Sequence, residues 1–255
     1  MIHNPAISPF FRSILFILAA CAGAAGFQPQ AMAETDMREP LAAIRVPEEA
    51  PIPSSALEQR LIQEGLVDVR AMDPDIRVDL KYAQADNFMG MNVYGDLQGA
   101  YLRPQAARKL VKANQILRER HPDLCILVVD ALRPRSIQHK MWKIVAGTPM
   151  QPYVANPHYG SMHNFGAAVD VTLYNVKTDE RLDMGTPIDF FGPMAQPRLE
   201  ARHSREGKLS ERQVENRLIL RNTMRAAGWH MLNIEWWHFN AFPRDYIRRT
   251  YTIIE

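Results

Sequence analysis

The alternation of apolar and polar positions along the chain predicts four strands. Residues 76–82 place an apolar side chain at every second position, which is the period of a strand with one exposed face. Residues 125–129 are continuously apolar and mostly β-branched, as expected of a strand buried on both faces. Further strands are predicted over 168–173, where alternate side chains would point to opposite faces, and over 234–239.

Four helices are predicted from apolar spacing together with start and stop signals. Those over 55–65 and 210–228 each begin with a capping box, a serine followed three positions later by Glu or Gln. The helix over 104–121 begins at a proline, which a first helical turn tolerates, and ends at a His-Pro pair. The fourth helix is predicted over 136–145, with Ser136 as its cap.

Between the third strand and the last helix, residues 175–208 show little periodicity and many charges. A long surface excursion is predicted there, with 189–192 as a short anchored turn. No internal repeat is visible, and helices and strands are mixed without regular alternation. The chain is therefore predicted to form one α+β domain, with a small, mainly antiparallel sheet and flanking helices.

The first 33 residues have the pattern of an export signal. A basic residue precedes an apolar run, and the A-M-A run that ends at Ala33 supplies the small residues that a signal peptidase recognises. The predicted destination is the periplasm. An alternative is a lipoprotein signal over 1–20, because the L-A-A-C run resembles a lipobox. Cleavage before Cys21 would leave a lipid anchor on that residue and a membrane-anchored lipoprotein.

Composition and charge divide the rest of the chain. Residues 34–53 are rich in proline and acidic side chains, which predicts an extended arm or linker and leaves 54–255 for the folded domain. The formal net charge of +2 gives no reason to expect nucleic acid as a partner. If Cys21 leaves with the signal or carries lipid, Cys125 is the remaining thiol. No intrachain disulfide can then form, and Cys125 is predicted to be a buried structural thiol.

Two short runs carry candidate metal chemistry. The run S-M-H-N-F-G-A-A-V-D places His163 and Asp170 seven positions apart, and both are good ligands for zinc. The run E-W-W-H adds Glu235 and His238. A catalytic zinc has three protein ligands and an adjacent base, and these four residues could supply both. The alternative for each histidine is a hydrogen-bonded structural role.

Glu235 and His238 are three positions apart, which puts them on opposite faces of a regular strand. A bulge or a strong twist would be needed to bring both toward one metal ion.

The pair S-x-H-x6-D and E-W-W-H, in this order and separation, resembles the D-alanyl-D-alanine dipeptidases, the zinc peptidases of vancomycin-resistance clusters. The similarity begins near the D-L-K-Y-A run at 79–83 and continues through D-N-F-x-G-x-x-V-Y-G at 86–95. It includes the R-P pair at 133–134 and ends just after His238. The resemblance implies a zinc site on the sheet of a DD-peptidase or hedgehog-like fold, with Zn²⁺ as cofactor.

The resemblance also implies roles for individual residues. Glu235 would be the base, with orientation of His238 as the alternative. Arg133 would stabilise the oxyanion, where the alternative is a surface ion pair with an acidic neighbour, Asp130 or Glu119. Tyr82 and Ser161 would line the dipeptide site. Asp189 would hold the substrate ammonium, and the alternative is an aspartate that caps a turn.

The function implied is zinc-dependent hydrolysis of the D-Ala-D-Ala dipeptide, in cell-wall turnover or D-alanine recycling. One alternative is a D,D-carboxypeptidase or endopeptidase that acts on intact wall peptides. The other is a non-catalytic, zinc-containing wall-binding module, which the presence of Glu235 disfavours because a structural zinc does not need a base. A small D,D-dipeptide is the expected partner, and the sequence indicates no protein partner.

Overall fold

The computed structural model describes residues 55–255. The predicted export signal, its lipobox alternative and the arm lie outside the described residues. Within residues 55–255, none of the helices is long and apolar enough to cross a membrane.

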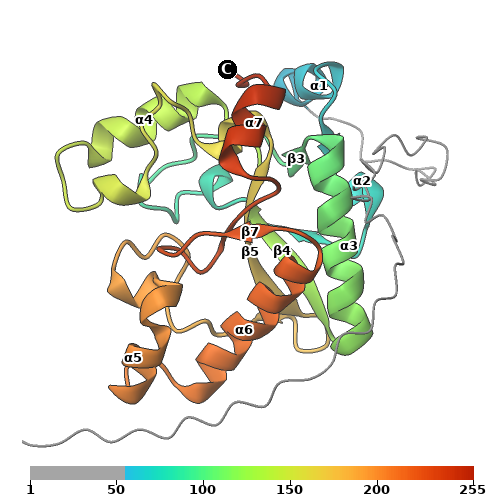
Figure 1. The fold of residues 1–255 in the computed structure, drawn as a ribbon. Coiled ribbons are helices and arrows are strands. Elements are labelled where there is room, and N and C mark those ends of the chain that lie inside the picture. Colours follow the sequence, from blue (N-terminus) through green and yellow to red (C-terminus); the bar gives the residue numbers. More distant parts are fainter. Residues whose placement is uncertain (1–54) are drawn as a thin grey trace, which may run out of the picture. The chain divides into compact units, whose positions relative to one another are not determined.

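A six-stranded mixed sheet lies at the centre of the domain (Figure 1). Five strands follow the order β2-β4-β5-β8-β7, and β6 pairs with β5 off this path. The pair β2 and β4 is parallel and the other pairs are antiparallel. The bounds of the strands are β2 (Arg77–Val78), β4 (Leu124–Asp130), β5 (Ala168–Asn175), β6 (Glu180–Arg181), β7 (His230–Met231) and β8 (His238–Asn240).

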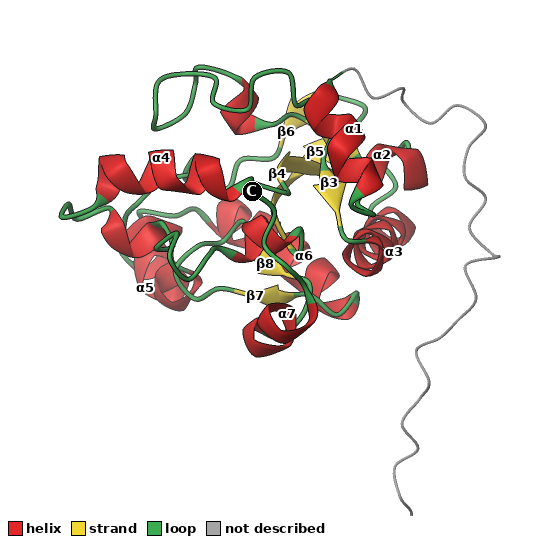
Figure 2. Ribbon diagram, turned by 90° about the horizontal axis from the view of Figure 1, so that it is seen from above, coloured by secondary structure: helices red, strands yellow, loops and turns green. Residues whose placement is uncertain are grey.

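Helices cover the sheet from two sides. Figures 1 and 2 both place β4 and β5 between α3 and α4, and α3 packs against α6 and β4. The strands β1 (Val67–Asp68) and β3 (Tyr101–Leu102) form a separate antiparallel pair. The helices are α1 (Ala56–Gln63), α2 (Val69–Met72), α3 (Pro104–Arg120), α4 (Arg135–Val145), α5 (Glu200–Arg205), α6 (Glu211–Ala226) and α7 (Arg244–Thr250).

The predicted α+β class is confirmed, and so are the elements with the strongest local signals. Both capping boxes are present, with Ser55 and Ser210 accepting from the backbone of the third helical residue. Pro104 is the first residue of α3. All seven residues of β4 are buried, as its continuous apolar run predicts, and Cys125 is a buried free thiol within it.

Several predicted boundaries are wrong. The strand predicted over 76–82 pairs only at Arg77–Val78, after which a 3-10 turn, η2 (Lys81–Ala83), carries Tyr82 into the core. The alternating apolar residues of this segment are mostly buried, but the segment does not continue as a paired strand. Ser136 does not cap α4, since Pro134 occupies that position and α4 begins at the following residue. The excursion over 175–208 contains β6 and α5. Neither was predicted, because the many charged residues of this segment show no clear apolar period.

The last strand begins at His238 and not at 234. The Glu235-Trp236-Trp237 segment bends before the strand, and Trp236 Nε1 donates to Thr186 Oγ1 at 2.8 Å. Since Glu235 lies outside the pleat, the expected bulge or twist is not needed for Glu235 and His238 to reach one site.

Candidate metal centre and active site

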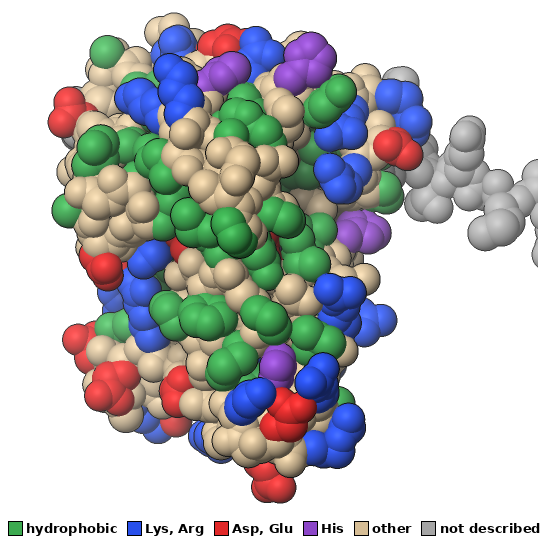
Figure 3. Space-filling model, turned by 90° about the vertical axis from the view of Figure 1, so that its left-hand side faces the viewer, with side chains coloured by type: hydrophobic (Ala, Val, Ile, Leu, Met, Phe, Trp, Pro, Cys, Tyr) green, Lys and Arg blue, Asp and Glu red, His purple; other side chains and the backbone are tan. Residues whose placement is uncertain are grey.

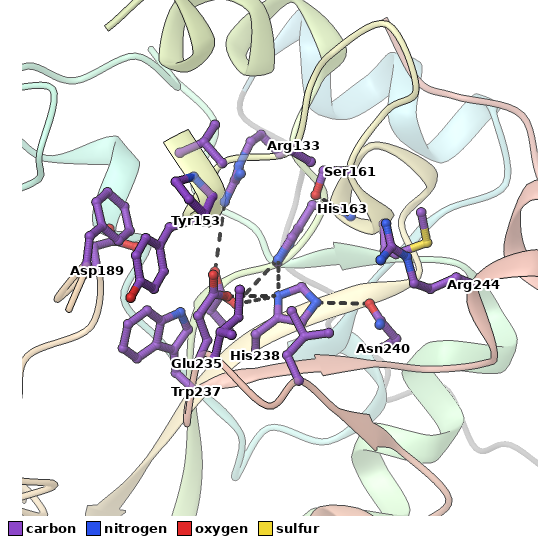
Figure 4. A pocket seen from close by; sticks show the side chains of 18 of the residues that line it. Arg133, Tyr153, Ser161, His163, Asp189, Glu235, Trp237, His238, Asn240 and Arg244 are labelled. Atoms are coloured by element: carbon purple, nitrogen blue, oxygen red, sulfur yellow. Dashed lines mark hydrogen bonds and ion pairs between the residues drawn. The ribbon is translucent and has the colours of Figure 1, made fainter. Parts of the chain in front are cut away.

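A cavity of about 230 Å³ opens beside the ends of β5 and β8 (Figure 4). This volume is small next to the roughly 300–1,000 Å³ of pockets for drug-sized ligands, so it suits a compact molecule. Hydrophobic side chains gather across the middle of the molecular face on the side of α4 and α5 (Figure 3). All eight residues singled out from the sequence line the cavity: Tyr82, Arg133, Ser161, His163, Asp170, Asp189, Glu235 and His238.

Three buried side chains converge at the floor of the cavity. The ligand atoms of His163, Asp170 and His238 all lie within 4.8 Å of one another. His238 Nδ1 is 3.0 Å from both Asp170 Oδ1 and His163 Nε2. Asp170 and His238 are cross-strand partners in the β5–β8 ladder, so strand register fixes their separation.

His163 reaches the same point from a short 3-10 turn, η4 (Met162–Phe165). Ser161 caps this turn and Asn164 completes the capping box, while Gly166 ends it with φ 66. Asn164 also donates from Nδ2 to the carbonyl of Arg133 at 2.7 Å, which ties η4 to the loop after β4. The turn therefore has little freedom to move His163 relative to the sheet.

Outer hydrogen bonds determine which imidazole nitrogens face the group. His163 Nδ1 is 2.7 Å from the carbonyl of Ala131, and a carbonyl can only accept. His163 therefore donates from Nδ1 and presents Nε2 with its lone pair. His238 Nε2 is 2.9 Å from Asn240 Oδ1, which leaves Nδ1 facing Asp170. Such outer partners are usual for histidines that bind metals.

The electrostatics of the group favour a cation. Burial alone would raise the pKa of Asp170, but His163 and His238 lower it well below its ordinary value. Burial alone would lower the pKa of His163, but the carboxylates of Asp170 and Asp130 raise it. Two imidazoles and a carboxylate are also the donor types that zinc prefers. The three side chains therefore fit a bound divalent metal.

Glu235 lies at the edge of this group and is 8% exposed. Its Oε2 is 4.0 Å from His238 Nδ1, which is too long for a hydrogen bond. Burial raises the pKa of Glu235 to about 8, against the lowering effect of His238. A buried carboxyl with a pKa near neutrality suits proton transfer.

On another wall of the cavity, Tyr82 and Asp189 meet although they are 107 positions apart. The hydroxyl of Tyr82 donates to Asp189 Oδ2 at 2.9 Å. Asp189 has φ 64, in the left-handed region that non-glycine residues occupy at some cost. Burial raises the pKa of Asp189 to about 7, and Asp170 adds to the shift. The carboxyl is held in a constrained position facing the cavity.

Arg133 combines features of both interpretations proposed for it. It forms an ion pair with Asp130, but it is 7% exposed and lines the cavity, so this pair is not a surface one. Its Nε donates to Asp130 Oδ2 at 3.1 Å and its Nη1 to Gln138 Oε1 at 3.0 Å. Its Nη2 lies 3.8 Å from Asp170 Oδ2. Most of its donors are therefore already engaged by protein acceptors.

Three other histidines lie outside the group. His158 and His230 are exposed, and His203 is buried on α5. Two further contributors were missed. Asn240 lies two positions after His238, on the same face of the strand, so period two could have indicated it. Arg244 follows six positions after His238, where no periodic signal connects it to the ligands.

A buried His-Asp-His group beside a carboxyl of raised pKa, inside a small cavity, is the arrangement of a metal-dependent hydrolase. The sequence profile of the peptidase M15 family, described as D-ala-D-ala dipeptidase, matches residues 62–254. The chain therefore belongs to this family of metallopeptidases.

Individual relatives agree with this assignment. A D-alanyl-D-alanine dipeptidase of Escherichia coli K12 is 33% identical over 174 residues, which cover 68% of this chain and 83% of the relative. A D-alanyl-D-alanine dipeptidase of Enterococcus faecium is 28% identical over 197 residues, covering 67% and 90%. A third, of Enterococcus faecalis, is 25% identical over 206 residues, covering 72% and 95%.

Proposed function

We propose that this protein hydrolyses the D-Ala-D-Ala dipeptide in a zinc-dependent reaction. The observation that carries the proposal is the cavity itself, in which the His-Asp-His group lies beside Glu235 and faces the Tyr82–Asp189 pair. Membership of the peptidase M15 family supplies the substrate class. The proposed setting is cell-wall turnover or D-alanine recycling.

His163 Nε2, His238 Nδ1 and a carboxylate oxygen of Asp170 would hold the zinc ion. When bound, zinc polarises the scissile carbonyl and acidifies the attacking water. The chain supports this with the hydrogen bonds from His163 to Ala131 and between His238 and Asn240, which fix both rings in orientation.

Glu235 is proposed as the general base that takes a proton from the attacking water and delivers it to the leaving amine. Its separation from His238 Nδ1 supports this role over simple orientation of the ring, because the two groups are not hydrogen bonded. A cation at the ligand group would lower the pKa of Glu235 from about 8 toward neutrality, where a base is most effective.

Asp189 is proposed to bind the ammonium of the substrate, with Tyr82 orienting its carboxylate. Ser161 would contact the bound dipeptide from the start of η4, since its Oγ accepts from the backbone of His163 and its own hydroxyl proton is free to donate. Arg133 would stabilise negative charge on the scissile carbonyl oxygen through Nη2, the part of its guanidinium nearest Asp170.

The length of the substrate tests this proposal. Acetylation of the amino end replaces the ammonium by an amide and leaves Asp189 with an unpaired charge, which discriminates sharply against the longer molecule. We expect kcat/KM for D-Ala-D-Ala to exceed that for N-acetyl-D-Ala-D-Ala, and for a wall pentapeptide with the same two C-terminal residues, by orders of magnitude. Zinc content is measured on the same preparation.

Two results would contradict the proposal. Comparable kcat/KM values for the three substrates would indicate a D,D-carboxypeptidase and would remove the role of Asp189. Stoichiometric zinc without hydrolysis of any of them would indicate a non-catalytic, zinc-containing module.

We also propose that the protein is exported to the periplasm, on the basis of the predicted signal over 1–33. Mass spectrometry of the mature protein tests this. A new N-terminus at Glu34 supports the soluble form, and a lipid-modified Cys21 supports the anchored lipoprotein. Retention of Met1 would contradict export by either route.

A further inference from the structure

We propose that Arg244 binds the C-terminal carboxylate of the substrate and thereby selects dipeptides whose carboxyl end is free. This inference rests on the proposed dipeptidase function and deepens it. Arg244 lines the same cavity as the ligand group (Figure 4). Arg244 is also exposed to solvent. It lies in a part of the chain to which the sequence patterns assigned no role.

The fold holds Arg244 at a defined place. The chain leaves β8 at Asn240, and the next two residues, Ala241 and Phe242, are buried. Pro243 then caps α7, so that Arg244 is the first residue of the helix. The helix packs against η4, the turn that carries His163. The position of Arg244 is therefore coupled to the position of a ligand.

The charge of Arg244 has no partner among residues 55–255. Arg244 forms no hydrogen bond and no ion pair with any of the described residues. The other cation that lines the cavity, Arg133, is buried and is already paired with Asp130 and Gln138. Of these two arginines, Arg244 is the one without a side-chain partner among the described residues, so both arms of its guanidinium can bind a carboxylate. A guanidinium presents two parallel N–H donors, which match the two oxygens of a carboxylate.

The cavity has a negative side chain, Asp189, and a positive one, Arg244, which match the positive and negative ends of a free dipeptide. Asp189 and Arg244 are on opposite sides of the two histidines in Figure 4. A free dipeptide has an ammonium at one end, a carboxylate at the other and the scissile amide between them. With the ammonium at Asp189 and the carboxylate at Arg244, the amide would lie over the His-Asp-His group. Arg244 is therefore a specificity-determining and positioning residue rather than a catalytic one.

The decisive experiment compares two ligands that differ only at the carboxyl end. KM is measured for D-Ala-D-Ala, and the inhibition constant is measured for D-alanyl-D-alaninamide as a competitor, in the wild type and in Arg244→Ala. We expect KM for the free acid to rise by about 10- to 100-fold in the variant, as for loss of a hydrogen-bonded ion pair, while kcat changes little. The inhibition constant of the amide should change less than threefold, because the amide has no carboxylate to lose.

Matched variants separate charge from structure. Arg248→Ala removes another exposed arginine of the same helix that does not line the cavity, and it should leave both constants unchanged. Arg244→Lys keeps the charge without the bidentate geometry and should restore part of the affinity for the free acid. Added salt should raise KM of the wild type and leave that of Arg244→Ala nearly constant, because an exposed pair is screened.

The outcomes distinguish this inference from the proposed function. If the wild type cleaves D-Ala-D-Ala and Arg244→Ala has an unchanged KM, the inference is wrong and the proposed function stands. An equal loss of affinity for the acid and the amide would assign Arg244 a structural role, which also overturns it. Failure of the wild type to cleave D-Ala-D-Ala would instead reject the proposed function.

Discussion

At the scale of single residues, Glu235 and Asp189 are the two carboxyls of the cavity whose pKa values lie near neutrality. Each leads to a separate prediction. Glu235→Gln keeps the shape of the side chain but cannot accept a proton. We expect a folded protein that still binds zinc, with kcat reduced by at least about 10²–10⁴-fold, the range for loss of a positioned base. Glu211→Gln, an exposed change in the first turn of α6, is the control. Near-normal turnover by Glu235→Gln would refute the assignment of the base.

Asp189 predicts a pH dependence of substrate binding. Its pKa is raised to about 7 by burial, so below pH 7 it becomes protonated and can no longer pair with an ammonium. In the Glu235→Gln background turnover is slow and residue 235 does not titrate, so Kd for D-Ala-D-Ala should rise as pH falls from 7 to 5. The rise should be up to about tenfold per pH unit. Isothermal titration calorimetry measures it.

The Asp189→Asn variant provides the comparison for this profile. The amide cannot ionise, so Kd should be weak and nearly constant over the same range. At higher pH the profile of the parent ends where the substrate ammonium itself loses its proton, at about pH 8. If Asp189→Asn showed the same pH profile as its parent, the ammonium would be bound elsewhere.

At the scale of single elements, η4 is the smallest piece on which the site depends. Asn164 is fully buried, accepts from Ser161 N at 2.7 Å and donates to the carbonyl of Arg133 at 2.7 Å. Asn164→Ala leaves both groups without partners, so the free energy of unfolding should fall by about 2–5 kcal/mol. Urea denaturation measures the loss, and Asn222→Ala on the exposed side of α6 is the control. An equal effect of the two changes would exclude this role for Asn164.

The elements differ in how far the sequence could predict them, for physical reasons. Capping boxes and the buried strand β4 are local signals, and they were found nearly to the residue. The helix α7 depends on packing against η4, which is remote in sequence, and β7 pairs with β8 over only two residues, so periodicity indicated neither α7 nor this pair. For the site, motif spacing and family resemblance brought eight residues to one cavity. Spacing could not indicate Arg244 or the hydrogen bond from Asn164 to the carbonyl of Arg133, because both depend on tertiary neighbours.

At the scale of the whole molecule, the ligand group links stability to metal. Three acidic side chains line the cavity, Asp170, Asp189 and Glu235, and without a cation they repel one another. Zinc at 100 times its Kd would stabilise the fold by about 2.7 kcal/mol. For a domain of this size that is roughly 5–10 °C in Tm. Calorimetry of chelated protein before and after zinc addition measures the shift.

Variants of two histidines make this measurement specific. His163→Ala removes a ligand, and its Tm should not respond to zinc. His158→Ala changes an exposed histidine outside the group and should respond as the wild type does. A full response by His163→Ala would show that the stabilising metal binds elsewhere.

The pairing of Asp170 with His238 across β5 and β8 has a consequence for how such enzymes diversify. The two strands are adjacent in the sheet, but the chain between them includes the excursion over 175–208, which contains Asp189. Ladder register fixes Asp170 against His238, whereas the excursion carries Asp189, the residue proposed to bind the amino end of the substrate. Apart from β6, which pairs with β5, the excursion is not part of this ladder, so we expect length changes beyond β6 to leave the register of β5 with β8 unchanged. We therefore expect that exchange of the part of the excursion beyond β6 between relatives alters which peptide is accepted while Asp170 and His238 keep their places in the ladder.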